Sequence, residues 1–250
     1  IQAPLGILSN SLILPLLPKF SKLRSYKDSR GFQKKLISGI EYCFLTTIFL
    51  TGFFITFNNQ IVQLVFQRGV FDYSATLKVK NILIAYGFGI PFYLYRDLLV
   101  RTYYSIEKTN FPFKSSFAGI ILNIFFDWFL IGAPINNFGN LSPYNFGVVG
   151  IILSSVIVNF IVCIFLSFNL RNENIILPNL ELLRKISLMS LAAFIDCTLC
   201  FTILKTTNNL NSNLAEFLLL IFGTLTFFII YYLLTKCLKV NKFQVSKKEI

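Results

Sequence analysis

The sequence contains no histidine, and charged residues make up only 14% of its 250 positions. Without histidine, the chain cannot by itself supply Ser-His-Asp or Cys-His catalysis, or a histidine metal site. It also lacks a glycine-rich phosphate loop and a GxGxxG pattern. Its one CxxC pair, Cys197 and Cys200, lies inside an apolar run with no second pair at ligand spacing. Packing is therefore favoured over a redox role for these thiols.

Apolar residues dominate what is present. Hydrophobic residues make up 55% of the chain, aromatic residues 16%, and the mean hydropathy is +0.67. Runs of about 20 apolar residues match the thickness of a bilayer crossed by a helix, and they are too long and unbroken for barrel strands. The sequence thus predicts an all-α, polytopic helical membrane protein. The seven predicted spans are 3–17, 36–57, 81–104, 114–134, 146–169, 187–205 and 214–235.

The first residue is isoleucine rather than methionine, and apolar character is already established at Ala3. We therefore expect the chain to begin inside or just before a helix, with something upstream missing. The first run has no charged n-region or small-residue cleavage site, so we do not interpret it as a signal peptide.

Basic residues are distributed unevenly among the predicted loops. Segments 18–35, 101–114, 170–185 and 236–250 carry eighteen lysines and arginines, whereas the loops on the opposite side carry four. The positive-inside rule then places the basic loops and the C-terminus in the cytoplasm, facing anionic membrane lipids. A nucleic-acid partner would also suit the net charge of +12. Basic loops beside a membrane are the more usual explanation, so we expect no nucleic acid.

Polar side chains inside spans are costly and therefore informative. Arg96 and Asp97 point about 100° apart on a helix, so they cannot simply pair with each other, and at least one should face a polar cavity or another helix. Arg101 is near enough to the cytoplasmic end of its span to reach the interface. The charged residues in or at the edges of the spans are Glu41, Arg96, Asp97, Arg101, Asp127, Asp196 and Glu216, of which Glu41 and Glu216 are expected to reach water.

Asp127 follows Asn123 by four residues, which places a carboxylate and an amide on one helix face. Ser155 and Asn159 repeat this spacing in the next span. Together these oxygens form a ligand set that a hard cation such as Na⁺ accepts. The alternatives are an interhelical hydrogen-bond cluster, an ion pair between Asp127 and Arg96, and a proton relay.

Several segments resemble the MurJ (MviN) family of lipid II flippases, in the family's order. In "LVRTYYSIEKTNFPFKSS", four residues match a family fingerprint, although Lys108 and Phe111 replace its usual aspartate and second threonine. "QAPLGILSNSLILPLLPKFSKL" is similar to the family's Pro-x-Gly run, and "LVFQRGVFD" to its Leu-x-x-Arg-Gly-x-Phe. "YGFGIPFYLYRDLLVR" and "FGVVGIILSSVIVN" also fit. The matching motif residues are Pro4, Gly6, Arg68, Gly69, Arg101, Tyr104, Thr109 and Pro112.

The resemblance implies the C-terminal half of a fourteen-span transporter, not an enzyme, in the bacterial cytoplasmic membrane. Residues 1–170 would be the core of one lobe, 171–235 two further spans with a possible lipid-tail groove, and 236–250 a basic tail. The substrate would be lipid II or another polyprenyl-linked glycan, and the partner the missing N-terminal lobe. Arg96, Asp97 and Arg101 become candidates for a polar path.

Some members of the family bind sodium, and no other cofactor is implied. Transferred residue by residue, the ligands would be Asn123, Asp127, Ser155 and the main-chain carbonyl of Ile151, with Asp127 as the charged metal ligand. Three alternatives remain open for the chain. These are a drug or polysaccharide exporter of the same superfamily, a membrane transferase, for which no loop shows a motif, and a non-transporting remnant.

Overall fold

The computed structural model describes residues 6–7, 9–25, 28–66, 73–132, 144, 146–173, 175, 180–207 and 213–237. All regular elements in these ranges are helices, which confirms the all-α prediction. In chain order they are the π-helical η1 (Ser9–Ile13), α2 (Leu16–Ser25), α3 (Ser29–Thr56), α4 (Asn58–Phe66), α5 (Tyr73–Ser105), α6 (Asn110–Ile131), α7 (Val148–Asn172), α8 (Leu180–Thr207) and α9 (Asn213–Cys237).

Four helices in the described part of the chain are long and apolar enough to cross a membrane. They are Ser29–Thr56, Thr76–Ser105, Asn110–Ile131 and Val148–Asn172, and they cover the second to fifth predicted spans. A shorter apolar stretch, Gly223–Leu233, lies within α9. The chain is therefore a helical membrane protein. α8 and α9 coincide with the last two predicted spans. Among the described residues, however, only the four helices named above are both long enough and apolar enough to be candidate spans.

The first predicted span, 3–17, differs from a continuous helix. Within its described residues, the backbone forms the π-helical turn η1, in which the Leu14 N–H donates to the Ser9 carbonyl at 3.0 Å. A turn at Leu14 and Pro15 follows, and α2 then begins at Leu16 and runs to Ser25. Pro15 has no N–H and its ring clashes with the preceding helical turn, so the helix cannot continue through it.

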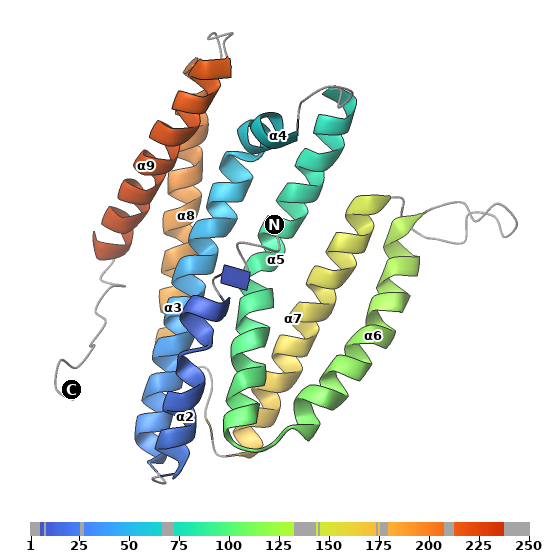
Figure 1. The fold of residues 1–250 in the computed structure, drawn as a ribbon, viewed down its shortest axis with the longest axis vertical. Coiled ribbons are helices and arrows are strands. Elements are labelled where there is room, and N and C mark those ends of the chain that lie inside the picture. The colour runs from blue at the N-terminus through green and yellow to red at the C-terminus, as the bar shows by residue number, and fades with distance from the viewer. Residues whose placement is uncertain are drawn as a thin grey trace, which may run out of the picture.

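The helices form a layered bundle with α5 at its centre (Figure 1). α5 packs against α3 on one side and α7 on the other, α6 covers α7, and α8 and α9 extend the bundle beyond α3. The end of α2, the start of α3, the end of α5, the start of α6 and the end of α7 all lie at the lower end of the view. The described parts of the basic segments 18–35 and 101–114 and the end of α7 thus lie at one end of the bundle.

Pro91 lies inside α5 and is accommodated by its neighbour α3. A proline at this position cannot donate to the Gly87 carbonyl four residues earlier. The Thr51 hydroxyl of α3 donates to that carbonyl at 2.8 Å. Because backbone groups in a bilayer need partners within the protein, this bond satisfies the acceptor that Pro91 leaves free.

Candidate functional site

The α6–α7 oxygen cluster consists of Asn123, Asp127, Ser154 and the carbonyl of Ile151. The Ser154 hydroxyl is fully buried and lies 3.4 Å from Asn123 Oδ1 and 2.8 Å from the Ile151 oxygen. It also contacts Asp127 Oδ1. A hydroxyl has one proton, so it donates to one of these three acceptors at a time. The cluster is therefore richer in acceptors than in donors.

Three glycines bring α6 and α7 together at this cluster. Gly132 ends α6 in the left-handed conformation, with φ of 68°. The chain then returns so that the Gly147 N–H donates to the Ile131 carbonyl at 2.9 Å. A Cβ on Gly150 would lie 2.6 Å from the Leu130 carbonyl oxygen, closer than any side chain allows. Glycine at position 150 thus permits the close approach that sets Ser154 against Asp127.

The structure places the predicted ligand residues of α7 differently from the sequence prediction. Asn123, Asp127 and the Ile151 carbonyl converge as expected, but the hydroxyl among them belongs to Ser154 rather than to Ser155. The Ser155 side chain instead lies close to Tyr93 of α5. Asn159, expected beside Ser155, donates to the Ser155 carbonyl at 2.7 Å.

Arg96 bridges α5 to α7 and α6. Its guanidinium donates to Asn159 Oδ1 at 2.9 Å and to Ser116 Oγ at 3.2 Å. None of the ion pairs between described residues joins it to Asp127, the pairing considered from the sequence. The prediction that at least one of Arg96 and Asp97 faces another helix is confirmed by these bonds of Arg96.

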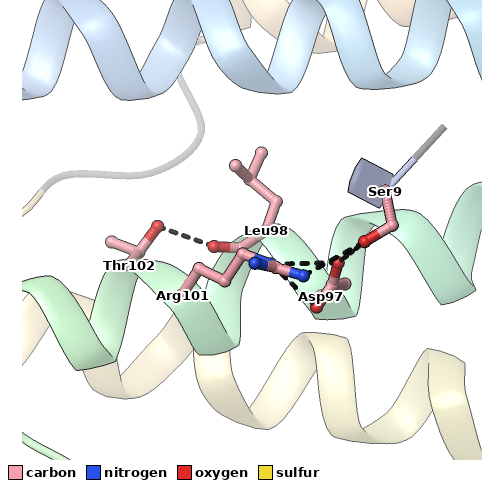
Figure 2. Close-up of polar contacts among 5 residues, drawn as sticks. All are labelled: Ser9, Asp97, Leu98, Arg101 and Thr102. Atoms are coloured by element: carbon pink, nitrogen blue, oxygen red, sulfur yellow. Dashed lines mark hydrogen bonds and ion pairs between the residues drawn. The ribbon is translucent and has the colours of Figure 1, made fainter. Parts of the chain in front are cut away.

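Asp97 forms a polar cluster with Arg101 and Ser9 (Figure 2). Arg101 Nε lies 3.1 Å and 3.2 Å from the two carboxylate oxygens of Asp97. Ser9, in the π-helical turn, donates to Asp97 and accepts from the Arg101 guanidinium at 3.2 Å. Both charged groups, expected as parts of a polar path, therefore fasten the interrupted first helix to α5, and Arg101 points to this cluster rather than only to the interface.

The elbow between α5 and α6 contains the remaining fingerprint residues. Pro112 is buried in the first turn of α6, where its missing N–H does no harm. Lys108 pairs with Glu173 at 3.2 Å, which links the elbow to the end of α7. A cavity of about 520 Å³ opens at the elbow, and its lining residues are Tyr104, Thr109, Asn110, Pro112, Phe113 and Ser116.

Glu41 was expected to be solvated, but it is only 9% exposed and pairs with Lys185 of α8 at 2.7 Å. No sequence pattern predicted this contact, because it depends on α8 packing against α3. Asp196 in α8 is fully buried. Its Oδ2 has no hydrogen-bond partner among the described residues.

Some predicted residues fall outside the described part of the chain: Pro4, Arg68, Gly69, the side chain of Glu216, and residues 238–250 of the basic tail. Gly6 is described and exposed. Among the described residues, no three His, Cys, Asp or Glu side chains group closely enough to hold a metal ion. Any ion at the α6–α7 oxygen cluster would therefore rely on one carboxylate and neutral oxygens, a set that suits a monovalent cation better than a divalent one.

Comparison with known proteins gives consistent matches. The chain is 39% identical over 156 residues to the probable lipid II flippase MurJ of Synechocystis sp., which covers 62% of this chain and 27% of that protein. It is 28% identical over 172 residues to the lipid II flippase MurJ of Thermosipho africanus, covering 67% of this chain and 32% of that protein. The matched part thus spans about a third or less of these curated relatives.

A solved structure, a lipid II flippase MurJ in its inward closed conformation, has the same fold. The TM-score is 0.68 at 21% identity, and the match covers 95% of this chain and 45% of that one. The profile of the family described as lipid II flippase MurJ matches residues 1–243, nearly the whole chain. The chain therefore belongs to the MurJ lipid II flippase family, a family of membrane transporters rather than enzymes.

Proposed function

We propose that this chain forms one lobe of a flippase that moves lipid II across the cytoplasmic membrane by alternating access. The family match over residues 1–243 carries the proposal. Because the relatives are much longer than the matched part, the N-terminal lobe of the same protein is the required partner. A related polyprenyl-linked glycan is the second candidate substrate.

The physical requirement for such transport is a polar route. A pyrophosphate-linked sugar headgroup is too costly to move through hydrocarbon, so the protein must present a hydrated path that opens to one side at a time. Arg96, Asp97 and Arg101 lie on α5 within the bundle and supply charge along such a path. Arg96 is hydrogen-bonded to Asn159, and Arg101 to Asp97. These bonds fix the charged groups in position, which supports this role.

The proposed topology has seven spans, with α8 and α9 crossing the membrane as the last two. Its support is the common lower end of the described basic residues of α2, the start of α3, the end of α5 and the start of α6, which we assign to the cytoplasm; the positive-inside rule assigns the basic C-terminus to the same side. Anionic lipids of that leaflet would face these segments. The exposed apolar side chains Leu191, Phe194, Leu225 and Phe228 on α8 and α9 favour a lipid-facing role, such as a groove for the polyprenyl tail.

We further propose that a cation, with Na⁺ as the candidate, binds at the α6–α7 oxygen cluster. The crowding of acceptors around the single proton of Ser154 supports this, because a cation relieves their repulsion. The proposed ligands are Asn123, Asp127, the Ile151 carbonyl and Ser154, the last in place of Ser155. A bound ion would shift the transport equilibrium only through its different affinity for the two conformations. The membrane potential would add about 2.3 kcal/mol per charge per 100 mV.

The test is complementation of a flippase-depleted bacterium with the full-length gene. We expect the wild-type gene to restore growth and Asp127→Ala to fail at equal expression. Ser154→Ala should weaken rescue, whereas the matched control Ser155→Ala should not.

Failure of the wild-type gene would contradict the lipid II assignment and favour an exporter of another substrate or a non-transporting protein. A flipping assay with purified lipid II separates these two alternatives. Full rescue by Asp127→Ala would contradict the cation site and leave the family membership unaffected.

A further inference from the structure

The guanidinium of Arg96 has no acidic partner in the described part of the chain. Its two hydrogen bonds go to neutral oxygens, those of Asn159 and Ser116. The adjacent Asp97 is paired with Arg101 instead. Arginine keeps its charge in proteins, and a charge within a membrane span is costly when only neutral groups surround it. Arg96 therefore has an unused capacity to bind an anion.

The elbow cavity lies next to this charge. Ser116 both accepts the hydrogen bond from Arg96 and lines the cavity of about 520 Å³. Thr109 and Asn110 add a hydroxyl and an amide to the same lining. A cavity of this volume is within the range of ligand sites in proteins.

The rim of the cavity is aromatic. Phe113 is 74% exposed and Tyr104 is 50% exposed, and both line the opening. Aromatic side chains at such positions are typical of the depth of lipid headgroups. Lys114 follows Phe113 in sequence and is exposed, although it does not line the cavity, while Lys108 is already neutralised by Glu173. The positive charge closest to the lining is thus that of Arg96, behind Ser116.

We propose that the elbow cavity binds the phosphate of an anionic phospholipid, with Arg96 as its main anchor. The planar guanidinium, which lies behind Ser116 rather than in the lining itself, reaches the phosphate by exchanging its hydrogen bond with Ser116 for two parallel bonds to phosphate oxygens. The hydroxyls of Thr109 and Ser116 donate to the remaining oxygens, and Phe113 contacts the glycerol and acyl region. This site goes beyond the proposed lipid II transport and does not depend on it.

The experiment measures lipid binding to the purified full-length protein by native mass spectrometry. Phosphatidylglycerol is compared with phosphatidylcholine at equal concentration, and inorganic phosphate is added as a competitor in a separate arm. We expect Arg96→Gln to lower the phosphatidylglycerol affinity about tenfold, because it removes a charge-assisted pair. Arg24→Gln, the same charge loss at an exposed site on α2, should change it less than about twofold.

A second variant, Ser116→Leu, fills the cavity and keeps the Arg96 charge, so it tests the site even if Arg96→Gln fails to fold. Equal loss in both variants, with phosphatidylcholine bound weakly throughout, supports the lipid site. Displacement of phosphatidylglycerol by inorganic phosphate in the wild type, but not in Arg96→Gln, supports the same anion site with free phosphate as the ligand. An unchanged affinity in both variants, or equal binding of phosphatidylcholine, overturns the proposal. Growth complementation is read separately, so failure of this site and failure of the transport proposal are distinguishable.

Discussion

Two interfaces of the bundle are held together in different ways. Between α5, α6 and α7, polar groups meet across the helices, as in Arg96 with Asn159 at 2.9 Å and Tyr95 with Ser167 at 2.9 Å. Between α3, α8 and α9, aromatic rings of α3 and α9 pack against one another beside small residues of α8. Phe227 lies 5.3 Å from Phe49 between ring centroids, and Phe49 lies 5.4 Å from Tyr231.

The difference indicates that polar contacts between helices are characteristic of the α5, α6 and α7 region. Lipid tails are as apolar as phenylalanine, so a ring-packed interface gains its stability mainly from close fit. Buried polar pairs are costly to assemble and are retained where they specify a structure or serve a function. The exceptions at the aromatic interface are the Glu41–Lys185 pair and Asp196, and they provide the sharpest ways to test the contrast.

The largest effect is expected from Lys185→Met, which leaves the carboxylate of Glu41 buried and unpaired. Removing one partner of a buried pair costs about 3 kcal/mol in the free energy of unfolding. Chemical unfolding of the purified protein measures this cost. The double variant Glu41→Met with Lys185→Met should recover most of it, and simple additivity of the two single losses would contradict a direct pairing.

A smaller loss is expected at the polar interface from Gly150→Val. The new Cβ would meet the Leu130 carbonyl oxygen at 2.6 Å, so α6 and α7 must separate, at a cost of about 2 kcal/mol. Gly119→Ala is the matched control, because its Cβ would meet Val158 and Val162 at an ordinary 3.6 Å. Thermal stability in detergent should fall for the first variant and not for the second. Equal stabilities would show that the two helices are free to move apart.

Two tyrosine hydroxyls allow a direct comparison of the interfaces. Tyr103 donates to the Leu166 carbonyl at 2.8 Å within the core, and Tyr231 donates to the Leu45 carbonyl at 3.0 Å in a partly buried position. We expect Tyr103→Phe to cost about 1 kcal/mol and Tyr231→Phe about 0.5 kcal/mol in unfolding free energy. The reverse order would mean that the aromatic interface depends more on hydrogen bonds than its composition indicates.

The smallest effect is expected from Asp196→Asn. Its Oδ2 makes no hydrogen bond within the described residues, so the substitution removes no pairing there. Growth rescue by the full-length gene should be unchanged, in contrast to Asp127→Asn, which alters a carboxylate surrounded by other oxygens. Loss of rescue in the Asp196 variant would assign a transport role to the aromatic interface as well.

Much of this arrangement follows from the sequence, and its failures have physical causes. The four-residue spacing of Asn123 and Asp127 correctly predicted a shared helix face, because helical periodicity is local. The choice between Ser154 and Ser155 was not decided by spacing, since two adjacent hydroxyls differ only in rotation about the helix. That rotation is set by the contact of Gly150 with Leu130, which joins residues distant in sequence.

The ion pair between Glu41 and Lys185 could not be predicted from the sequence either, because it joins residues that are far apart in the chain. Hydropathy shows that Glu41 and Lys185 lie near span ends, but it does not show which helices are neighbours. The interruption of the first helix could be anticipated from Pro15, since proline blocks helical continuation. The π-helical turn before it depends on the contacts of Ser9 with α5.

The hydrogen bond from Thr51 to the Gly87 carbonyl has an evolutionary consequence. Without the Thr51 hydroxyl, a proline at position 91 leaves the Gly87 carbonyl without a hydrogen-bond donor in the apolar interior. With the hydroxyl present, the proline is tolerated. Acceptance of one mutation thus depends on the other, although the two residues lie on different helices. Lineages that replace Pro91 are released from selection at Thr51, whereas those that retain it are not. The two positions should therefore be inherited as a pair.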